Sequence, residues 1–192
     1  MVASHDDEAS DRSGPVAGES TMMDMEEVTG RMRHNADAIA ALFAGVDDDF
    51  ARWRPGPDDW SLLEVICHLY DEEQYDFRTR LDILLHAPGT TWPPIDPPGW
   101  VTERRYNDRD PRTAVQDFLT ERDKSIAWLC SLESPNWSSK ATSPWGRTMT
   151  AGQMMRCWLA HDMLHVRQMA EIHHRRLETI EGSAAVEYAG GW

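Results

Sequence analysis

Two histidines of this chain have the spacing of a metal-binding pair. His161 and His165 lie one helical turn apart in the segment AGQMMRCWLAHDMLHVRQMAEIHHRR, which has the period of an amphipathic helix. At about 100° per residue, both fall at the centre of the apolar stripe that contains Met154 and Ile172. An H-x-x-x-H pair on one helix face offers two imidazole nitrogens to the same ion. We therefore predict a metal site here; the alternative is two core histidines satisfied by hydrogen bonds.

His68 is the predicted third ligand. It lies in the segment DDWSLLEVICHLYDEE, at the edge of the apolar side of a second expected helix. An edge residue can point into the seam between two helices, where helical bundles build their metal sites. We expect the side chain of His68 to meet those of His161 and His165 in such a seam.

No convincing fourth ligand accompanies the three histidines. Cys157 lies four residues before His161 and could contribute a thiolate, although buried cysteine is usually a small apolar residue. Asp162 is directed about 100° away from His161 around the helix and is a poor ligand candidate. A site with only three protein ligands keeps an open position, as catalytic zinc sites do.

Further polar and aromatic residues could support or surround this site. Gln168 and Glu72 could hydrogen-bond the ligands or carry protons, or they could serve helix packing and a solvated face. Arg122 lies in an otherwise apolar column and could bind a substrate carboxylate, with an internal salt bridge as the alternative. Trp60 and Trp100 could wall a substrate pocket, or simply anchor the loops beside them.

Four helices are expected to position these side chains. One begins at Asp24 and stops near Gly45, and the next runs from a Ser61–Glu64 capping box to about His86. The third begins at Asp110 and ends before Pro135, and the fourth runs from Thr150 to about Leu177. Long loops occupy residues 87–109 and the segment before Thr150. No segment alternates with period two, so we expect no sheet and predict an all-α four-helix bundle.

Composition bounds the class of protein. We expect one domain over residues 22–180, a disordered acidic tail over 1–21 and an irregular tail over 181–192. The net charge of −14 disfavours nonspecific binding to nucleic acid or to anionic membranes. No apolar run approaches the roughly 18 residues of a membrane span, and the N-terminus lacks the features of a signal peptide. We therefore predict a cytoplasmic protein whose three cysteines are reduced.

Two stretches of sequence resemble the DinB-like superfamily, most closely its DinB_2 branch. They are RWRPGPDDWSLLEVICHLYDEE and, far downstream, PWGRTMTAGQMMRCWLAHDMLHVRQMAEI, and the resemblance extends over about residues 24–177. It implies an up-down-down-up four-helix bundle that is frequently dimeric. It also implies one divalent metal ion, often zinc or nickel, on three histidines. At the matching positions of this chain, these are His68, His161 and His165.

The resemblance also implies a class of reaction. Members of the superfamily include S-transferases that use a low-molecular-weight thiol such as bacillithiol or mycothiol, and a mycothiol-dependent isomerase. The favoured hypothesis is therefore a metal-dependent transferase that joins such a thiol to an electrophilic small molecule. A metal-dependent hydrolase, with water as the nucleophile, is one alternative. The other is a non-catalytic, stress-associated protein whose metal only fastens two helices together.

Overall fold

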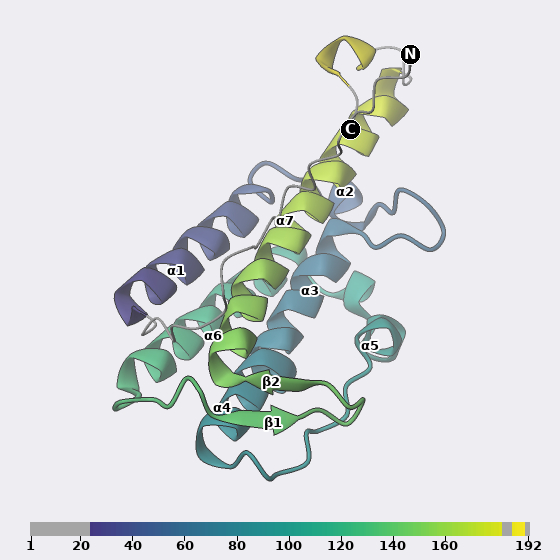
Figure 1. The fold of residues 1–192 in the computed structure, drawn as a ribbon. Coiled ribbons are helices and arrows are strands. Elements are labelled where there is room, and N and C mark those ends of the chain that lie inside the picture. Colours follow the sequence, from purple (N-terminus) through teal and green to yellow (C-terminus); the bar gives the residue numbers. More distant parts are fainter. Residues whose placement is uncertain (1–23, 182–185, 191–192) are drawn as a thin grey trace, which may run out of the picture.

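The computed structural model describes residues 24–181 and 186–190, and four long helical rods form most of this part of the chain (Figure 1). The predicted all-α four-helix bundle is confirmed. The rods are α1 (Met25–Ala41), the pair α3 (Leu62–Glu72) and α4 (Arg78–His86), α6 (Pro111–Ser131) and α7 (Ala151–Glu181). Between α1 and α3 lies the short helix α2 (Asp48–Arg52), and a 3-10 turn spans Glu187–Ala189.

The helices begin where the sequence predicts. Ser61 accepts a hydrogen bond from the Glu64 amide at 3.2 Å, and the Glu64 carboxylate accepts one from the Ser61 amide at 2.8 Å. Asp110 caps α6 through the amide of Thr113, with proline at the first helical position. Such caps satisfy amides that have no partner inside the helix. They fix the starting residue of each rod, and hence the turn on which each later side chain lies.

The rods pack in a ring, with α1 and α3 each between α6 and α7. Two core clusters at opposite ends give the directions of the rods. Ile39 of α1 shares one cluster with Leu62 of α3 and Ile172 of α7, whereas Val28 and Ala151 belong to the other. Thus α1 and α7 run one way, and α3–α4 and α6 run the other (Figure 1). This is the up-down-down-up order that the resemblance implies.

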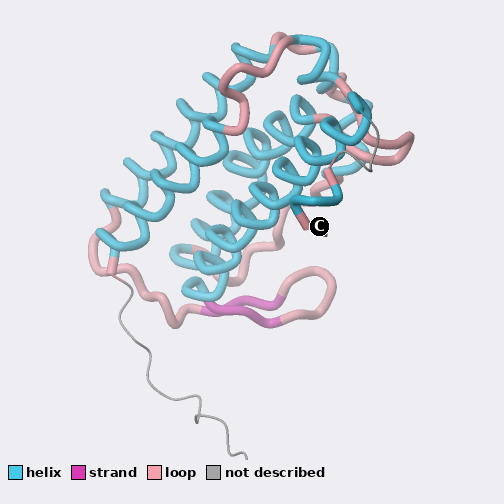
Figure 2. Tube along the Cα trace, turned by 90° about the horizontal axis from the view of Figure 1, so that it is seen from above, coloured by secondary structure: helices cyan, strands magenta, loops and turns pink. Residues whose placement is uncertain are grey.

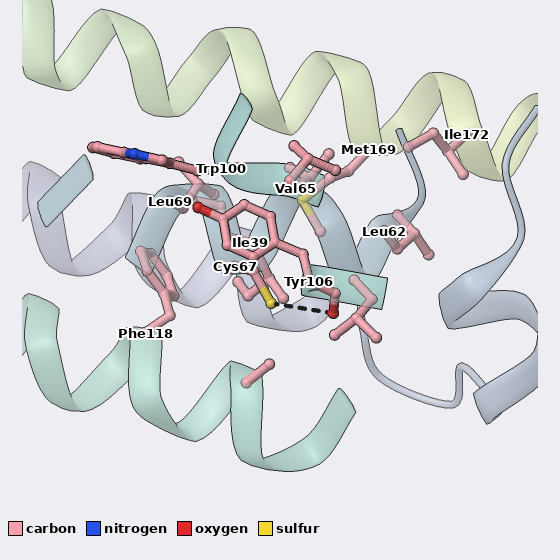
Figure 3. Close-up of a cluster of buried hydrophobic side chains, with 14 of the residues drawn as sticks. Ile39, Leu62, Val65, Cys67, Leu69, Trp100, Tyr106, Phe118, Met169 and Ile172 are labelled. Atoms are coloured by element: carbon pink, nitrogen blue, oxygen red, sulfur yellow. Dashed lines mark hydrogen bonds between the residues drawn. The ribbon is translucent and has the colours of Figure 1, made fainter. Parts of the chain in front are cut away.

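The connection from α4 to α6 must return the chain to the other end of the bundle, because these rods are parallel. The sequence predicts a long loop here, and the structure places α5 (Pro97–Glu103) and a 3-10 turn (Tyr106–Asp108) within it. Trp100 and Tyr106 are both buried in the first core cluster (Figure 3). The connection is therefore part of the core as well as a link.

A small hairpin corrects the prediction that the chain has no sheet. Strand β1 (Lys140–Thr142) pairs antiparallel with β2 (Thr148–Thr150) at one end of the bundle (Figure 2). Ala141 and Met149 face each other across the pair and are buried against the second core cluster. Strands of three residues are too short for a recognisable alternation of apolar and polar side chains. The hairpin leads directly into α7 and so determines where that helix begins.

One turn of π-helix, Glu73–Phe77, joins α3 to α4 within the predicted single helix. In an uninterrupted α-helix the nine steps from His68 to Phe77 turn through about 900°, which leaves these two side chains on opposite faces. The π turn absorbs an extra residue, so both rings contact His161, at centroid distances of 5.3 Å and 4.9 Å. The π turn therefore allows His68 and Phe77, on the same rod, both to face α7.

The predicted acidic tail of residues 1–21 lies outside the described residues, as does half of the predicted C-terminal tail of residues 181–192. Of the helices that the structure does describe, none is both long and apolar enough to cross a bilayer.

Candidate metal centre

The structure brings His68 of α3 together with His161 and His165 of α7. The Nε2 atom of His68 lies 3.4 Å from that of His161 and 3.1 Å from that of His165. The Nε2 atoms of His161 and His165 are 3.1 Å apart. Among the described residues, this is the group of histidine, cysteine or acidic side chains placed to hold a metal ion. Three ring nitrogens from two antiparallel helices thus converge on one point.

These separations fit a metal ion. Three nitrogens bound about 2.0–2.1 Å from one tetrahedral ion lie about 3.3 Å from one another. The observed range of 3.1–3.4 Å brackets that value. Hydrogen bonding alone explains the cluster poorly, since each neutral imidazole has one donor and one acceptor and three Nε2 atoms face a common centre. An ion accepting all three lone pairs satisfies them together.

Burial keeps the three rings neutral and ready to donate lone pairs. The pKa of His68 is lowered to about 2, first by burial and then by the neighbouring imidazoles. Burial likewise lowers the pKa of His161 to about 3, with a smaller effect from His165. The pKa of His165 is lowered by burial and partly restored by Gln168. Near neutral pH all three imidazoles are therefore unprotonated, as metal binding requires.

Gln168 fixes the orientation and tautomer of His165. Its Oε1 lies 2.8 Å from Nδ1 of His165, an arrangement in which Nδ1–H donates to the amide oxygen. With the proton on Nδ1, the lone pair of Nε2 is directed to the centre. Hydrogen-bonded partners of this kind orient metal-binding histidines and raise their basicity. The structure thus places Gln168 where the sequence suggested a supporting residue.

Glu72 lies one turn after His68, on the side of the ring opposite the centre. Its Oε1 is 3.8 Å from Nδ1 of His68, too far for a hydrogen bond, and within the described residues neither atom has a hydrogen-bond partner. Burial, and then the charge of Asp76, raise the pKa of Glu72. Asp76 itself pairs with Arg80 at 2.5 Å. Glu72 is therefore a buried carboxyl beside His68, not part of a solvated face.

Aromatic rings cover the centre on two sides. The ring of Trp60 lies 5.0 Å from that of His68, and the ring of Phe77 lies 4.9 Å from that of His161. Trp100 does not join them: its ring packs on Tyr75 and under the guanidinium of Arg104. Of the two tryptophans predicted to wall a pocket, the structure places Trp60 at the centre and Trp100 in the core.

Arg122 is not available to a substrate, which corrects its predicted role. Its side chain is 1 % exposed and pairs with Glu73 at 2.6 Å and with Asp162 at 2.8 Å. It also donates to the carbonyl of Met32 on α1. The internal salt bridge, considered above as the alternative, is what the structure contains. Arg122 therefore links the histidine-bearing rods from behind the centre.

Sequence reasoning missed the polar network around Arg122. Glu73 accepts a further hydrogen bond from Trp158 Nε1 at 2.9 Å, and Asp162 accepts one from Asn35 at 3.0 Å. Asp162 follows His161 directly and had been considered only as a ligand. The available signal was charge at positions that the helical period places inside the bundle, where carboxylates need partners. Cys157 is exposed and takes no part in the centre.

Comparison with known proteins gives one family and several similar folds. A family model described as the DinB superfamily matches residues 31–169. A search of curated protein sequences found no match. Among solved structures, YfiT from Bacillus subtilis, described as a probable metal-dependent hydrolase with an unusual four-helix bundle topology, superposes with a TM-score of 0.72. Its sequence is 14% identical, and the match covers 85% of this chain and 95% of that one.

Two other solved structures share the fold. A mycothiol-dependent maleylpyruvate isomerase has a TM-score of 0.61 and 13% identity, with 77% of this chain and 61% of the isomerase covered. This chain therefore spans about three fifths of the isomerase's length. DfsB, described as a sibling lethal factor precursor, has a TM-score of 0.56 and 16% identity, with 84% and 99% covered. At these identities the likeness concerns the fold.

Proposed function

The chain belongs to the DinB superfamily, and we propose that it is a metal-dependent enzyme that transfers a low-molecular-weight thiol to an electrophilic small molecule. The observation that carries this proposal is the convergence of three Nε2 atoms at 3.1–3.4 Å, with no fourth protein ligand among the described residues. Such a centre leaves room for one exogenous ligand. Mycothiol and bacillithiol are the type of thiol we propose.

The three histidines would hold one divalent ion, for which imidazole nitrogen suits zinc and nickel well. An ion of this kind, when bound, lowers the pKa of a thiol or water in its open position. The protein's own contribution is to keep His68, His161 and His165 neutral and fixed. Gln168 holds the His165 ring, while Trp60 and Phe77 exclude water from two sides. A dry, preorganised site strengthens the electrostatic effect of the ion.

The reaction that we propose is a substitution or addition at carbon. The S–H bond of the thiol breaks, its sulfur forms a bond to an electrophilic carbon, and the thiol proton passes to solvent. In a substitution, a halide or alkoxide leaves with the carbon's former bonding pair. In an addition, the pair of an activated double bond accepts a proton from solvent instead. Neither route needs an oxidant or a reductant, which agrees with a centre of three neutral imidazoles and a redox-inert ion such as zinc.

Hydrolysis is the second candidate, because the same open position could take water. The description of YfiT as a probable metal-dependent hydrolase favours it, as the fold is shared over 85% of this chain. The two candidates differ in the exogenous ligand, so a spectroscopic measurement of that ligand separates them. A non-catalytic protein would bind the ion without turnover of either kind.

The test begins with the metal content of untagged protein, compared with His161→Ala and with His86→Ala, a matched control at an exposed histidine. We expect close to one ion per chain in the parent and the control, and a large loss in His161→Ala. Thiols are then added to cobalt-substituted protein. A shift in the visible spectrum, with turnover of an epoxide, alkyl halide or activated alkene, supports the transferase. Parent protein that binds no zinc, nickel or cobalt would refute it, and turnover with water alone would favour the hydrolase.

A further inference from the structure

Four polar or charged side chains form a row along the α3–α4 rod, at intervals of four residues. The row begins at the metal centre with His68 and continues through Glu72 and Asp76 to Arg80. All four side chains are buried, with exposed fractions of 4–7 %. Buried polar groups are costly unless they satisfy one another. Only the first two members were singled out from the sequence, and the other two lead away from the centre.

Each member of the row lies next to the following one. Oε1 of Glu72 is 3.8 Å from Nδ1 of His68. The carboxyl groups of Glu72 and Asp76 are close enough that each shifts the pKa of the other. Nη1 of Arg80 lies 2.5 Å from Oδ1 of Asp76. The row is thus a continuous path of side-chain neighbours from a candidate metal ligand to Arg80.

The far end of the row is held by two tryptophans from other parts of the chain. The guanidinium carbon of Arg80 lies 5.1 Å from the ring centroid of Trp92 and 5.1 Å from that of Trp145. The two indoles meet edge to face, with centroids 5.8 Å apart. Trp92 is buried in the connection after α4, whereas Trp145 lies in the turn between β1 and β2 and is 61 % exposed. These contacts leave Arg80 little freedom to turn away from Asp76.

The near end of the row lacks one hydrogen bond. With the lone pair of Nε2 directed to the centre, the ring proton of His68 lies on Nδ1. Over the residues that the structure describes, neither this nitrogen nor Oε1 of Glu72 has a hydrogen-bond partner, although both atoms are buried. A displacement of about 1 Å would bring the two atoms to hydrogen-bonding distance. An oxygen of Glu72 can accept in either protonation state of the carboxyl.

We propose that Arg80 is a positioning residue for the metal centre. Through Asp76 it holds Glu72 in place. Glu72 then accepts the Nδ1 proton of His68 and fixes this ring for an ion on Nε2. Gln168 serves a ligand on α7 in the same way, so each of the two rods has its own orienting partner. This role rests on the metal centre of the proposed function and is independent of the thiol.

The test is the affinity for cobalt, measured from the visible spectrum in competition with a chelator. Glu72→Leu removes the acceptor and should weaken binding about 10- to 100-fold, whereas Glu72→Gln keeps an amide oxygen and most of the affinity. Asp76→Leu and Arg80→Met in one protein remove the ion pair without leaving an unpaired buried charge, and should weaken binding about tenfold. Added to Glu72→Leu, the same two substitutions should cause no further loss, because their effect passes through Glu72.

Two further variants separate positioning from general stability. Glu121→Leu with Arg78→Met removes an ion pair between the same rod and α6, and should leave the affinity for cobalt unchanged. Trp145→Ala removes one indole from Arg80 at an exposed position, where substitutions have small effects on folding. It should weaken cobalt binding about two- to fivefold, the value of an exposed cation–π contact, and should have no effect in the Glu72→Leu protein.

The outcomes separate this role from the proposed function. If cobalt affinity is unchanged both in the paired variant, Asp76→Leu with Arg80→Met, and in Trp145→Ala, the role of Arg80 is overturned and the centre itself stands. Losses that persist in the Glu72→Leu protein, or that the α6 control shares, overturn it as well. If the paired variant does not fold, Trp145→Ala decides alone. A parent that binds no cobalt overturns the metal centre together with this role.

Discussion

The guanidinium of Arg122 donates to both carboxylate oxygens of Asp162, at 2.9 Å and 2.8 Å, and Asp162 is the residue that follows His161. Arg122 also donates two hydrogen bonds to Oε1 of Glu73, the first residue of the π turn. One buried side chain of α6 therefore ties together the two rods that carry the histidines. The separation of those rods determines whether three Nε2 atoms meet, so the network behind the centre matters to the centre itself.

Replacing Arg122 with methionine should destabilise the protein severely. The substitution leaves Glu73 and Asp162 buried without their cation, and breaking a buried pair in this way costs about 3–5 kcal/mol. Urea unfolding of parent and variant measures the loss. Arg33→Met, at an exposed position of α1, should change the free energy of unfolding by less than about 0.5 kcal/mol. A variant as stable as the parent would mean that the network does not hold the rods.

Replacing Gln168 with leucine should weaken metal binding by about 10- to 100-fold, because His165 loses the acceptor that fixes its tautomer. Competition with a zinc chelator gives the affinity. Gln168→Glu keeps an acceptor at the same place and should retain the affinity. If leucine and glutamate reduced it equally, the hydrogen bond to Nδ1 would not be the cause.

The stability of the metal-free protein should fall as the pH drops below about 6.5. The folded-state pKa values of the three histidines lie below the unfolded value, so the unfolded chain binds more protons in this range. Each histidine that stays neutral in the folded protein lowers the free energy of unfolding by about 1.4 kcal/mol for each pH unit below its unfolded-state pKa. This contribution to stability is fully present above the unfolded-state pKa and is lost as the pH falls toward the folded-state pKa.

The contribution of one histidine can be isolated with His161→Gln, which removes that site and leaves the buried carboxyls in place. Between pH 6.5 and 5 the parent should lose about 2 kcal/mol more than this variant. Urea unfolding of chelator-treated proteins at several pH values measures the difference. The exposed His86→Gln variant should follow the parent, and parallel curves for all three proteins would contradict the assigned neutrality of His161.

Two of the three cysteines should react with a thiol reagent in the folded protein. Cys130 and Cys157 are exposed, whereas Cys67 is fully buried and its pKa is raised to about 12, first by burial. The thiolate is the reactive form, so Cys67 stays inert at pH 8. Colorimetric titration should count two thiols in the native protein and a third after denaturation. Three in the native protein would indicate that α3 opens readily.

The sequence was sufficient for the parts of the centre that depend on one helix at a time. The spacing of His161 and His165, and the cap at Ser61 that sets the turn of His68, are local properties. They predicted which rings share a face, and the resemblance supplied the arrangement of the rods. The structure then placed the three nitrogens within reach of one ion.

The remainder depends on contacts between distant residues. Arg122 is buried in an internal ion pair because Glu73 and Asp162 lie next to it, and these residues are 49 and 40 positions away in the chain. The π turn departs from regular α-helical geometry and places Phe77 and Glu73 against α7, where both contact Trp158. Neither feature produces a periodic sequence pattern from which it could be predicted.

The separation of His68 from His161 by 93 residues also bears on when the proposed ion could bind during synthesis. A ribosome that adds about 5–20 residues per second makes the second ligand roughly 5–20 s after the first. The other two ligands both lie on α7, so a growing chain contains only one of the three candidate ligands, His68, until α7 is made. A complete centre therefore requires that α7 has been synthesised and packed against α3, and a product that ended before His161 would lack two of the three ligands.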